Sequence, residues 1–407
     1  MRKSLLIVSG GIEAVPGIRL AKEMGLHVIV SDKNSNAPGF GLADDRIIAS
    51  TYDVEETVLA ARRYHTTVRP IDGVICIAAD VPLTVASVAD ALGLPGIPIE
   101  AAKLATEKLA MKQRFLEKDI AIPWFSEVES LEHLRQVVSK RGLPLVLKPV
   151  DSRGARGVLK LNSDVDLRWA FYHAQEFSPT CRVMVEEYVA GLQISTESIL
   201  LEGAGYTPGF IERNYEYLDR FAPNVIENGG QQPSALKRID QEAVSMLAEK
   251  AGRAMGITTG IIKGDMVMTW EGPKVIEIAA RLSGGWMSTD QIPLGTGVNL
   301  AGVAIRLALG EKIESGELVP KYNRGVAIRY FFPEPGRVQE IKYADKFDGL
   351  PWVYRLGFFV KTGDILEPVI NHTKRAGFVI TTGDTRDEAV ARASEVINTV
   401  KIITAPL

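Results

Sequence analysis

Short, continuous apolar runs alternate with amphipathic stretches through the first hundred residues. The apolar runs cover residues 4–9, 27–31 and 73–78. Runs of this kind are typical of strands that are buried on both faces of a parallel sheet. The amphipathic stretches cover residues 16–24 and 83–92, and a glycine follows each of them, as at the end of a helix. The pattern therefore predicts an open parallel α/β domain.

Two polar features interrupt this predicted domain where its strands end. Gly10 and Gly11 follow the first apolar run, and Asp80 follows the third. The carboxyl ends of parallel strands often carry a small-molecule site, so these residues are either site residues or plain turn residues. The glycines do not have the G-x-G-x-x-G spacing of a dinucleotide-binding loop. A Pro/Gly segment, residues 94–98, then marks a boundary.

Residues 263–285 predict a β-hairpin that carries charge on one face. Two apolar runs flank the turn residues Glu271, Gly272 and Pro273. With the turn centred on Glu271, Asp265 and Glu277 lie opposite each other. Two facing carboxylates destabilise a sheet, whereas Mg²⁺ between them would bind both, because it prefers oxygen ligands.

Strand alternation defines the two faces of this hairpin. Glu277, Ala279 and Arg281 lie on one face, with Ile276 and Ile278 on the other. The charged face fits a metal-bridged phosphate site. A solvated hairpin with scattered charges fits the same pattern.

A second candidate site surrounds Lys148, which lies in an otherwise apolar strand predicted over residues 143–150. A buried lysine is costly unless an anion accompanies it. The following loop, residues 151–157, is rich in small residues, and its backbone N–H groups are suited to phosphate oxygens. The loop lacks the Walker A pattern. A mobile hairpin tip is the alternative interpretation.

Several further positions are candidates of lower specificity. Thr106 is predicted to cap a helix that reaches Lys118 and carries Lys108 in its first turn, where the lysine is either solvated or bound to an anion. Strands are predicted over residues 182–189 and 194–201. A long polar loop, residues 213–232, precedes an amphipathic helix over residues 239–255.

Composition narrows the functional classes. The 407 residues are 46% hydrophobic, and 47 basic against 50 acidic residues give a net charge of −3. This balance argues against a nucleic-acid partner. The basic and then apolar start of the chain is too short for a membrane span and has no A-x-A-like cleavage site, so a strand is expected. We expect no membrane partner and a cytoplasmic location, with Cys76 and Cys181 as buried, reduced thiols.

The order of these parts resembles that of the ATP-grasp superfamily. A lysine at a helix start, a strand lysine before a Ser/Gly loop, an acidic segment and a D…E-x-x-x-R hairpin follow one another. Within the superfamily the chain looks like carboxylate–amine ligases of the L-amino acid ligase and purine-biosynthesis branches. The resemblance implies three domains: residues 1–100 (preATP-grasp α/β), 101–320 (ATP-grasp) and 321–407 (small, β-rich α+β).

The resemblance also implies roles for individual residues. The phosphate and ribose side would comprise Lys108, Lys148, Ser152, Arg153, Gly154 and Gln193, the last where the family often has a glutamate. The adenine-reading segment would comprise Glu186, Glu187 and Val189, acting mostly through the backbone. Asp265 and Glu277 match the metal ligands, and Arg281 matches the arginine that steadies an acyl phosphate, so Arg281 and Lys148 are the expected catalytic residues. Ala279 stands where the family frequently has an asparagine ligand.

The implied reaction is an ATP- and Mg²⁺-dependent ligation, with Mn²⁺ as a second candidate metal. Phosphoryl transfer from ATP converts a carboxylate into an acyl phosphate, and an amine then attacks it. The substrates would be small carboxylates and amines, with amino acids as one candidate class. Two alternatives remain: a purine-pathway or biotin-carboxylase-like enzyme that uses carboxyphosphate, and a non-catalytic nucleotide-binding protein.

The sequence is less specific about the second substrate. Arg213, Glu227 and the Gly229–Gly230 pair lie where relatives often bind it, although an ordinary surface loop fits equally well. Residues 283–285 are candidates for backbone donors to the reacting carboxylate. The five histidines match no motif and are predicted to be structural or exposed. A homodimer is one candidate for the oligomeric state, since relatives are often dimers.

Overall fold

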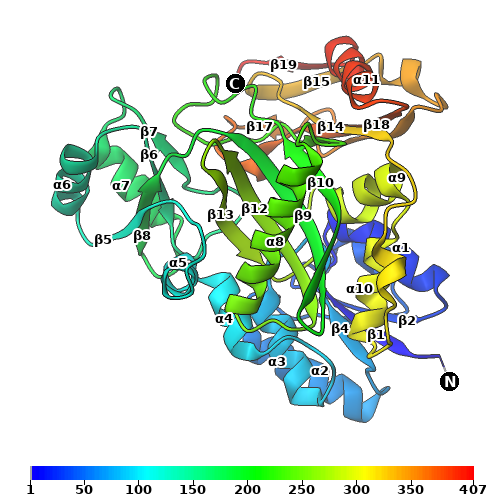
Figure 1. Cartoon of the computed structure of the whole chain (residues 1–407). Coiled ribbons are helices and arrows are strands. Elements are labelled where there is room, and N and C mark those ends of the chain that lie inside the picture. Colours follow the sequence, from blue (N-terminus) through cyan, green and yellow to red (C-terminus); the bar gives the residue numbers. More distant parts are fainter. Residues whose placement is uncertain (1) are drawn as a thin grey trace.

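The computed structural model describes residues 2–407 and contains four β-sheets (Figure 1). The first is a four-stranded parallel sheet in the order β3-β2-β1-β4. Its strands are β1 (Ser4–Val8), β2 (His27–Ser31), β3 (Asp45–Ile47) and β4 (Gly73–Ile75). The five side chains of β1 are all buried, as expected for a central parallel strand. The predicted parallel α/β fold at the N-terminus is therefore confirmed.

Helices cover both faces of this parallel sheet. They are α1 (Val15–Glu23), α2 (Val54–Thr67), α3 (Pro82–Leu92) and, from much later in the chain, α10 (Leu300–Ala308). One buried cluster contains residues of β1, α1, α10 and the central sheet, while the opposite face packs on α2 and α3. The parallel sheet and the central sheet thus share a hydrophobic core, which holds the two in a fixed relative position.

A small antiparallel lobe projects from the body of the molecule (Figure 1). Its strands have the order β5-β8-β6-β7. The elements are β5 (Phe125–Val128), α6 (Leu131–Arg141), β6 (Leu145–Pro149), β7 (Leu159–Leu161), α7 (Leu167–Glu176) and β8 (Val183–Glu187). Helices α6 and α7 pack on one face around a single cluster that includes Leu147 and Phe171. The strands predicted on either side of the 151–157 loop are therefore confirmed.

The central sheet has eight strands in the order β13-β12-β9-β10-β11-β14-β18-β16. They are β9 (Leu192–Leu201), β10 (Ala204–Arg213), β11 (Gly230–Gln232), β12 (Gly260–Thr269), β13 (Gly272–Ala279), β14 (Gly325–Phe331), β16 (Val353–Phe358) and β18 (Gly377–Gly383). Helix α8 (Arg238–Ala254) covers one face, as Figure 1 shows. Because β11 pairs with β14, the C-terminal strands extend this sheet.

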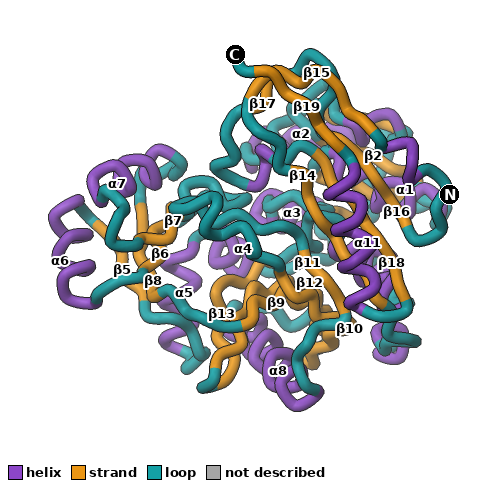
Figure 2. The backbone as a smooth tube through the Cα atoms, turned by 90° about the horizontal axis from the view of Figure 1, so that it is seen from above, coloured by secondary structure: helices purple, strands orange, loops and turns teal. Residues whose placement is uncertain are grey.

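The remaining elements complete the C-terminal region seen from above in Figure 2. A three-stranded sheet comprises β15 (Gly336–Lys342), β17 (Ile365–Leu366) and β19 (Lys401–Ala405), and α11 (Arg386–Thr399) packs on β14 and β18. A five-residue π-helix, Met287–Gln291, follows the hairpin and leads into α9 (Ile292–Thr296). The small, β-rich C-terminal region expected from the sequence is present.

Two local expectations were wrong. Thr106 does not cap a helix that carries Lys108. It ends α4 (Ile99–Thr106), and Glu107 caps the following helix, α5 (Lys108–Glu117), by accepting a hydrogen bond from the Ala110 N–H group. Cys181 is exposed, in a turn with a positive φ of 55°, whereas Cys76 is buried as predicted. The apolar character around Cys181 comes from the strand that starts after it.

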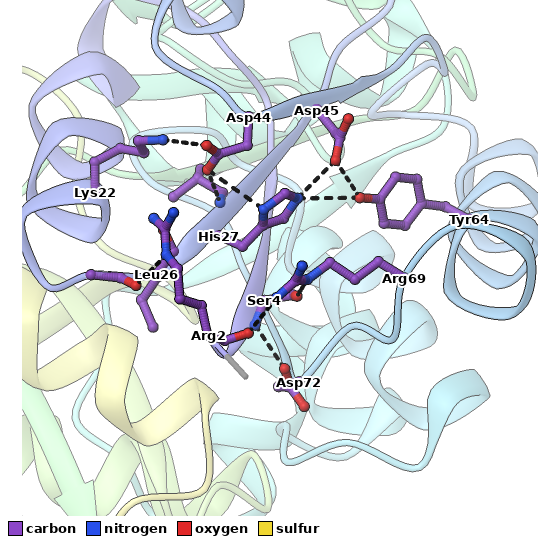
Figure 3. A network of polar contacts seen from close by, with 12 residues as sticks. Arg2, Ser4, Lys22, Leu26, His27, Asp44, Asp45, Tyr64, Arg69 and Asp72 are labelled. Atoms are coloured by element: carbon purple, nitrogen blue, oxygen red, sulfur yellow. Dashed lines mark hydrogen bonds and ion pairs between the residues drawn. The ribbon is translucent and has the colours of Figure 1, made fainter.

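A polar network ties the amino-terminal ends of the parallel strands together (Figure 3). Tyr64 of α2 donates a hydrogen bond of 2.6 Å to Asp45, and a ring nitrogen of His27 lies 2.7 Å from the same carboxylate. Asp72 accepts a hydrogen bond from the Ser4 N–H group. This network lies at the edge of the sheet opposite to the strand ends that carry Gly10 and Asp80, so the latter edge is left for a site.

Candidate active site

Two adjoining cavities lie where the lobe, the central sheet and the parallel sheet meet. Their volumes are about 430 Å³ and about 490 Å³. The first lies between the lobe and the β12–β13 hairpin. The second lies between the carboxyl edge of the parallel sheet, the segment after β13 and the loop before β18. Both cavities are lined by Asp80, Arg153, Gly154, Arg156, Arg213, Lys263, Arg281 and His372.

The hairpin places Asp265 opposite Glu277, as predicted, but by a different route. The turn is a two-residue connection that pairs Thr269 with Gly272. This turn without any other irregularity would place Asp265 opposite Ile276 instead of Glu277. A β-bulge between Asp265 and Met266 restores the pairing of Asp265 with Glu277. Ile276 is the extra residue, and it lines the first cavity beside Glu277 instead of facing away as strand alternation implied. Ala279 and Arg281 line the same cavity.

Both acids of the hairpin have basic partners. Asp265 accepts a hydrogen bond of 2.7 Å from Arg213 and forms an ion pair with Lys263. Burial alone would raise the pKa of Asp265, but Arg213 and Lys263 together hold it far below its ordinary value. Glu277 lies 3.3 Å from the ammonium group of Lys108. Asp265 is therefore an anion at every working pH, ready to bind a cation.

Lys108 connects the helix start to the phosphate-binding loop predicted from the sequence. Its side chain donates a 2.9 Å hydrogen bond to the backbone oxygen of Ser152. The same loop contacts both neighbouring regions of the chain. Arg153 lies with its guanidinium carbon 4.6 Å from the ring centre of Tyr52, and the Gly154 carbonyl accepts a hydrogen bond from the His372 N–H group. The loop is thus held over the junction of the two cavities.

Lys148 is buried and lines the first cavity, and its partner is a carboxylate of the protein. Glu186 binds Lys148 through one oxygen, and its other oxygen lies 3.1 Å from Lys112, a buried lysine that the sequence prediction did not single out. Burial would raise the pKa of Glu186, but the two lysines lower it. Three buried charges thus stand at the wall of the cavity.

The segment predicted to read adenine ends strand β8 at the mouth of the first cavity. Glu186, Glu187 and Val189 all line this cavity. Since the Glu186 carboxylate is bound by lysines, the groups it leaves for a ligand are those of the backbone. Gln193, at the start of β9, lines the same wall.

Asp80 meets Arg281 at the junction of the cavities. An isolated parallel bridge between Ile77 and Leu282 brings the end of β4 against the segment that follows β13. The Arg281 Nε atom lies 3.5 Å from the Asp80 carboxylate. Burial opposes ionisation of Asp80, but the field of Arg281 and nearby basic groups lowers its pKa. Asp80 therefore forms part of the wall of both cavities and is paired with Arg281.

The second cavity contains charged residues from four distant segments. Arg213 binds both Asp265 and Glu227, and Arg375 also binds Glu227. Glu13, from the turn after β1, accepts a hydrogen bond of 2.8 Å from the Gly285 N–H group. The stretch from Ser283 to Gly285 lines this cavity, whereas the Gly229–Gly230 pair lines neither cavity.

Three of these cavity residues were not found from the sequence. Glu13 and Arg375 belong to no recognised motif, and their only signal was a position after a strand or before one. His372, which was predicted to be structural or exposed, lines both cavities, a position that no sequence motif indicated. Its Nε2 atom accepts a hydrogen bond from the Glu227 N–H group, and burial lowers the pKa of His372 well below its ordinary value. The ring is therefore neutral.

The charge pattern fits a metal-bound triphosphate. Among residues 2–407, no group of three or more His, Cys, Asp or Glu side chains is arranged to hold a metal ion. Asp265 and Glu277 would supply two oxygen ligands, and the remaining positions would fall to water and phosphate oxygens, as is usual for Mg²⁺. Lys108 and the 151–157 loop line the same cavity, with the Lys108 ammonium group 3.3 Å from Glu277. Within the described part of the chain, no helix is long and apolar enough to cross a bilayer.

Comparisons with known proteins agree with this arrangement. Residues 105–285 match the model of the ATP-grasp domain, and residues 329–405 match the L-amino acid ligase C-terminal domain 2. An L-amino acid ligase from Bacillus licheniformis has a similar structure, with a TM-score of 0.84 and 22% identity over 99% of both chains. A 2-oxoglutarate carboxylase biotin carboxylase domain dimer from Hydrogenobacter thermophilus, solved with MgADP and bicarbonate, has a TM-score of 0.74 at 17% identity, over 99% of this chain and 91% of that one.

Similarity in sequence extends over the whole chain for some relatives and over half for others. A formate-dependent phosphoribosylglycinamide formyltransferase of Psychromonas ingrahamii is 24% identical over 98% of this chain and 96% of its own length. A D-alanine–D-alanine ligase of Bordetella avium is 26% identical over 49% of this chain and 62% of its own length. The chain therefore contains an ATP-grasp domain over residues 105–285 and an L-amino acid ligase C-terminal domain over residues 329–405, and it is similar to ATP-dependent carboxylate–amine ligases.

Proposed function

We propose that this ligase activates the carboxylate of one amino acid and joins it to the amine of a second. The observation that carries the proposal is the junction of the two cavities. The lysines and the hairpin acids surround the first cavity, while the second is lined by both acidic and basic side chains, including Glu13 and Arg375. A cavity with both charges suits a substrate with an ammonium and a carboxylate group.

In this proposal the first cavity binds ATP. Lys108 and Lys148 bind phosphate oxygens, and Ser152, Arg153 and Gly154 close over them. Glu187 and Val189 read the adenine through backbone groups, and Gln193 hydrogen-bonds the ribose hydroxyls. Asp265 and Glu277 would hold Mg²⁺, or Mn²⁺ in its place. The bound ion would neutralise part of the negative charge on the phosphates.

Positioning and charge stabilisation account for the chemistry. A carboxylate is a poor electrophile, and phosphorylation of its oxygen creates a leaving group that departs as phosphate when the amine attacks. Arg281 lies at the junction, where it would stabilise the negative charge of the transferred phosphoryl group. Burial would lower the pKa of Arg281, but the nearby Asp80 carboxylate raises it above its ordinary value. The guanidinium therefore stays charged at any working pH. No covalent enzyme intermediate is required.

A screen for phosphate release tests the proposal. The purified protein is incubated with MgATP and all pairs of the twenty amino acids, and products are identified by mass spectrometry. Release of phosphate with formation of a dipeptide supports the proposal. Bicarbonate and formate are tested separately, each with single amines. Turnover with one of these acids, and with no amino acid as the acid, would overturn it in favour of a carboxyphosphate- or formyl phosphate-type reaction.

The Glu277→Gln variant is the matched control for contaminating ATPase activity, since it removes a proposed metal ligand at nearly constant volume. The purified wild-type protein also serves to test whether the chain forms a homodimer. For a homodimer, light scattering should give a molar mass twice the chain mass of 44.4 kDa.

A further inference from the structure

Lys112 is a buried cation that lies just behind the wall of the first cavity. Helix α5 places it one turn after Lys108, so both side chains leave the same face of the helix. Lys108 lines the cavity, but Lys112 lies outside the lining of both cavities, and its side chain is 1% exposed. A lysine in this position cannot touch a ligand in the cavity, and burial of its charge requires a partner.

That partner is Glu186, which Lys112 shares with Lys148. One carboxylate oxygen binds Lys148, and the other lies 3.1 Å from the Lys112 ammonium group. The only other acceptor near Lys112 within the described chain is the Val275 carbonyl, at 3.4 Å. Two buried ammonium groups around one carboxylate leave an excess of one positive charge. Lys148 and Glu186 both line the cavity, and Lys148 is the cation of the trio that an incoming anion can reach.

We infer that Lys112 is a positioning residue: it holds Glu186 so that Lys148 can transfer its interaction from that carboxylate to a nucleotide phosphate. The inference rests on the proposed binding of ATP in the first cavity. Without Lys112, Glu186 would have Lys148 as its sole cation. The pair would be neutral, and a phosphate at Lys148 would compete with a buried carboxylate for that single cation, which is costly.

The protonation of Lys112 gives the inference a second, independent readout. The charged groups whose fields act on Lys112 are Glu186 from β8, Lys148 from β6 and Glu277 from β13. Burial lowers the pKa of Lys112 to about 8, although Glu186 opposes the shift. Above this pH Lys112 loses its charge, and Lys148 becomes the only cation on Glu186. Nucleotide affinity should therefore fall on the alkaline side.

The test compares nucleotide binding by the wild type with that of Lys112→Met and Lys112→Arg. MgADP affinity is measured by calorimetry between pH 6.5 and 9.5, together with the KM for ATP and kcat. At pH 7 we expect Lys112→Met to weaken MgADP binding and raise the KM for ATP by roughly tenfold or more, with a smaller change in kcat. Lys112→Arg should stay near the wild type and should lose the decline above pH 8, because a guanidinium remains charged.

An exposed lysine just beyond the same helix supplies the matched control. Lys118→Met should leave both affinity and its pH dependence unchanged. Thermal unfolding checks that each variant is folded. If Lys112→Met does not fold, the inference is tested by comparing the alkaline decline in MgADP affinity between the wild type and Lys112→Arg.

Two results would overturn the inference. Wild-type affinity in folded Lys112→Met is one, and an alkaline decline that persists unchanged in Lys112→Arg is the other. Failure of the wild type itself to bind MgADP or MgATP would instead overturn the proposed nucleotide site, and the role of Lys112 with it.

Discussion

Asp265 and Glu277 lie directly opposite each other in the β12–β13 hairpin because a bulge at Ile276 compensates for a two-residue turn. Each carboxylate has a cationic partner, Arg213 and Lys263 for Asp265 and Lys108 for Glu277. These partners remove much of the repulsion that two facing acids would otherwise cause. These partners therefore hold the two carboxylates in place without a metal.

We predict that Glu277→Gln lowers the rate of phosphate release by about 100-fold or more while the protein stays folded. The amide keeps the shape of the side chain but removes the charge that would bind Mg²⁺, and losses of this order follow removal of one electrostatic contact to a transition state. Turnover is measured against Mg²⁺ concentration. Glu271→Gln, at the exposed turn of the same hairpin, is the control. A Glu277→Gln variant with wild-type activity would contradict the metal assignment.

The contact between Tyr52 and Arg153 predicts an effect on loop closure. Tyr52→Ala removes the ring beneath the guanidinium, and an exposed cation–π contact contributes about 0.5–1 kcal/mol. We expect the KM for ATP to rise by roughly two- to fivefold with kcat unchanged, since the loop loses one of its contacts over the cavity junction. Tyr52→Phe keeps the ring and should behave as the wild type. Equal losses in the two variants would exclude the cation–π contact as the cause.

Features of the site that depend on local sequence were predictable, and those that depend on distant pairing were not. The sequence predicted the opposition of Asp265 and Glu277 from a turn centred on Glu271, whereas the structure reaches it with a two-residue turn and a bulge at Ile276, which left no sequence signal. A buried lysine in a strand predicts an anionic partner, but the sequence does not say which one. Lys148 binds Glu186, 38 residues later, and that choice depends on the pairing of β6 with β8.

The same distinction applies to the fold. The parallel strands β1, β2 and β4 were predicted because their apolar runs are continuous, whereas β3 has only three residues and gives little pattern. His372 lies just before β18, and it reaches the site because β18 joins the central sheet through β14 and β11, at the end of the sheet away from the hairpin. No local pattern around His372 contains that information.

The Tyr64 hydrogen bond in the network of Figure 3 predicts a loss of stability without a loss of activity. Tyr64→Phe removes a 2.6 Å hydrogen bond to the Asp45 carboxylate, and hydrogen bonds to charged groups contribute about 1.5–3 kcal/mol. Urea unfolding followed by circular dichroism should show a lower midpoint. The rate of phosphate release should not change, because the network lies at the opposite edge of the sheet from Gly10 and Asp80. Tyr172→Phe, at an exposed position, is the control, and an equal effect there would exclude the hydrogen bond as the cause.

Glu197 predicts that the protein loses stability as the pH rises through neutrality. Its side chain is fully buried in β9, where burial raises its pKa to about 7 against contacts with Ser283 and the charge of Lys263. The unfolded chain has an ordinary glutamate pKa of about 4.3, so the folded state binds more protons between these two values. Stability from this group is therefore fully present below about pH 4.3 and is lost as the pH rises through 7.

Glu197→Gln should abolish this part of the pH dependence, because an amide stays neutral at every pH. Thermal midpoints of the wild type and the variant are compared at pH 5.5, 7 and 8.5. We expect the variant to gain stability relative to the wild type as the pH rises, with the largest difference at pH 8.5. Glu202→Gln, in the exposed turn that follows β9, is the control for a general effect of removing a negative charge. A difference between the wild type and Glu197→Gln that does not vary with pH would show that Glu197 is already ionised in the folded protein at pH 5.5.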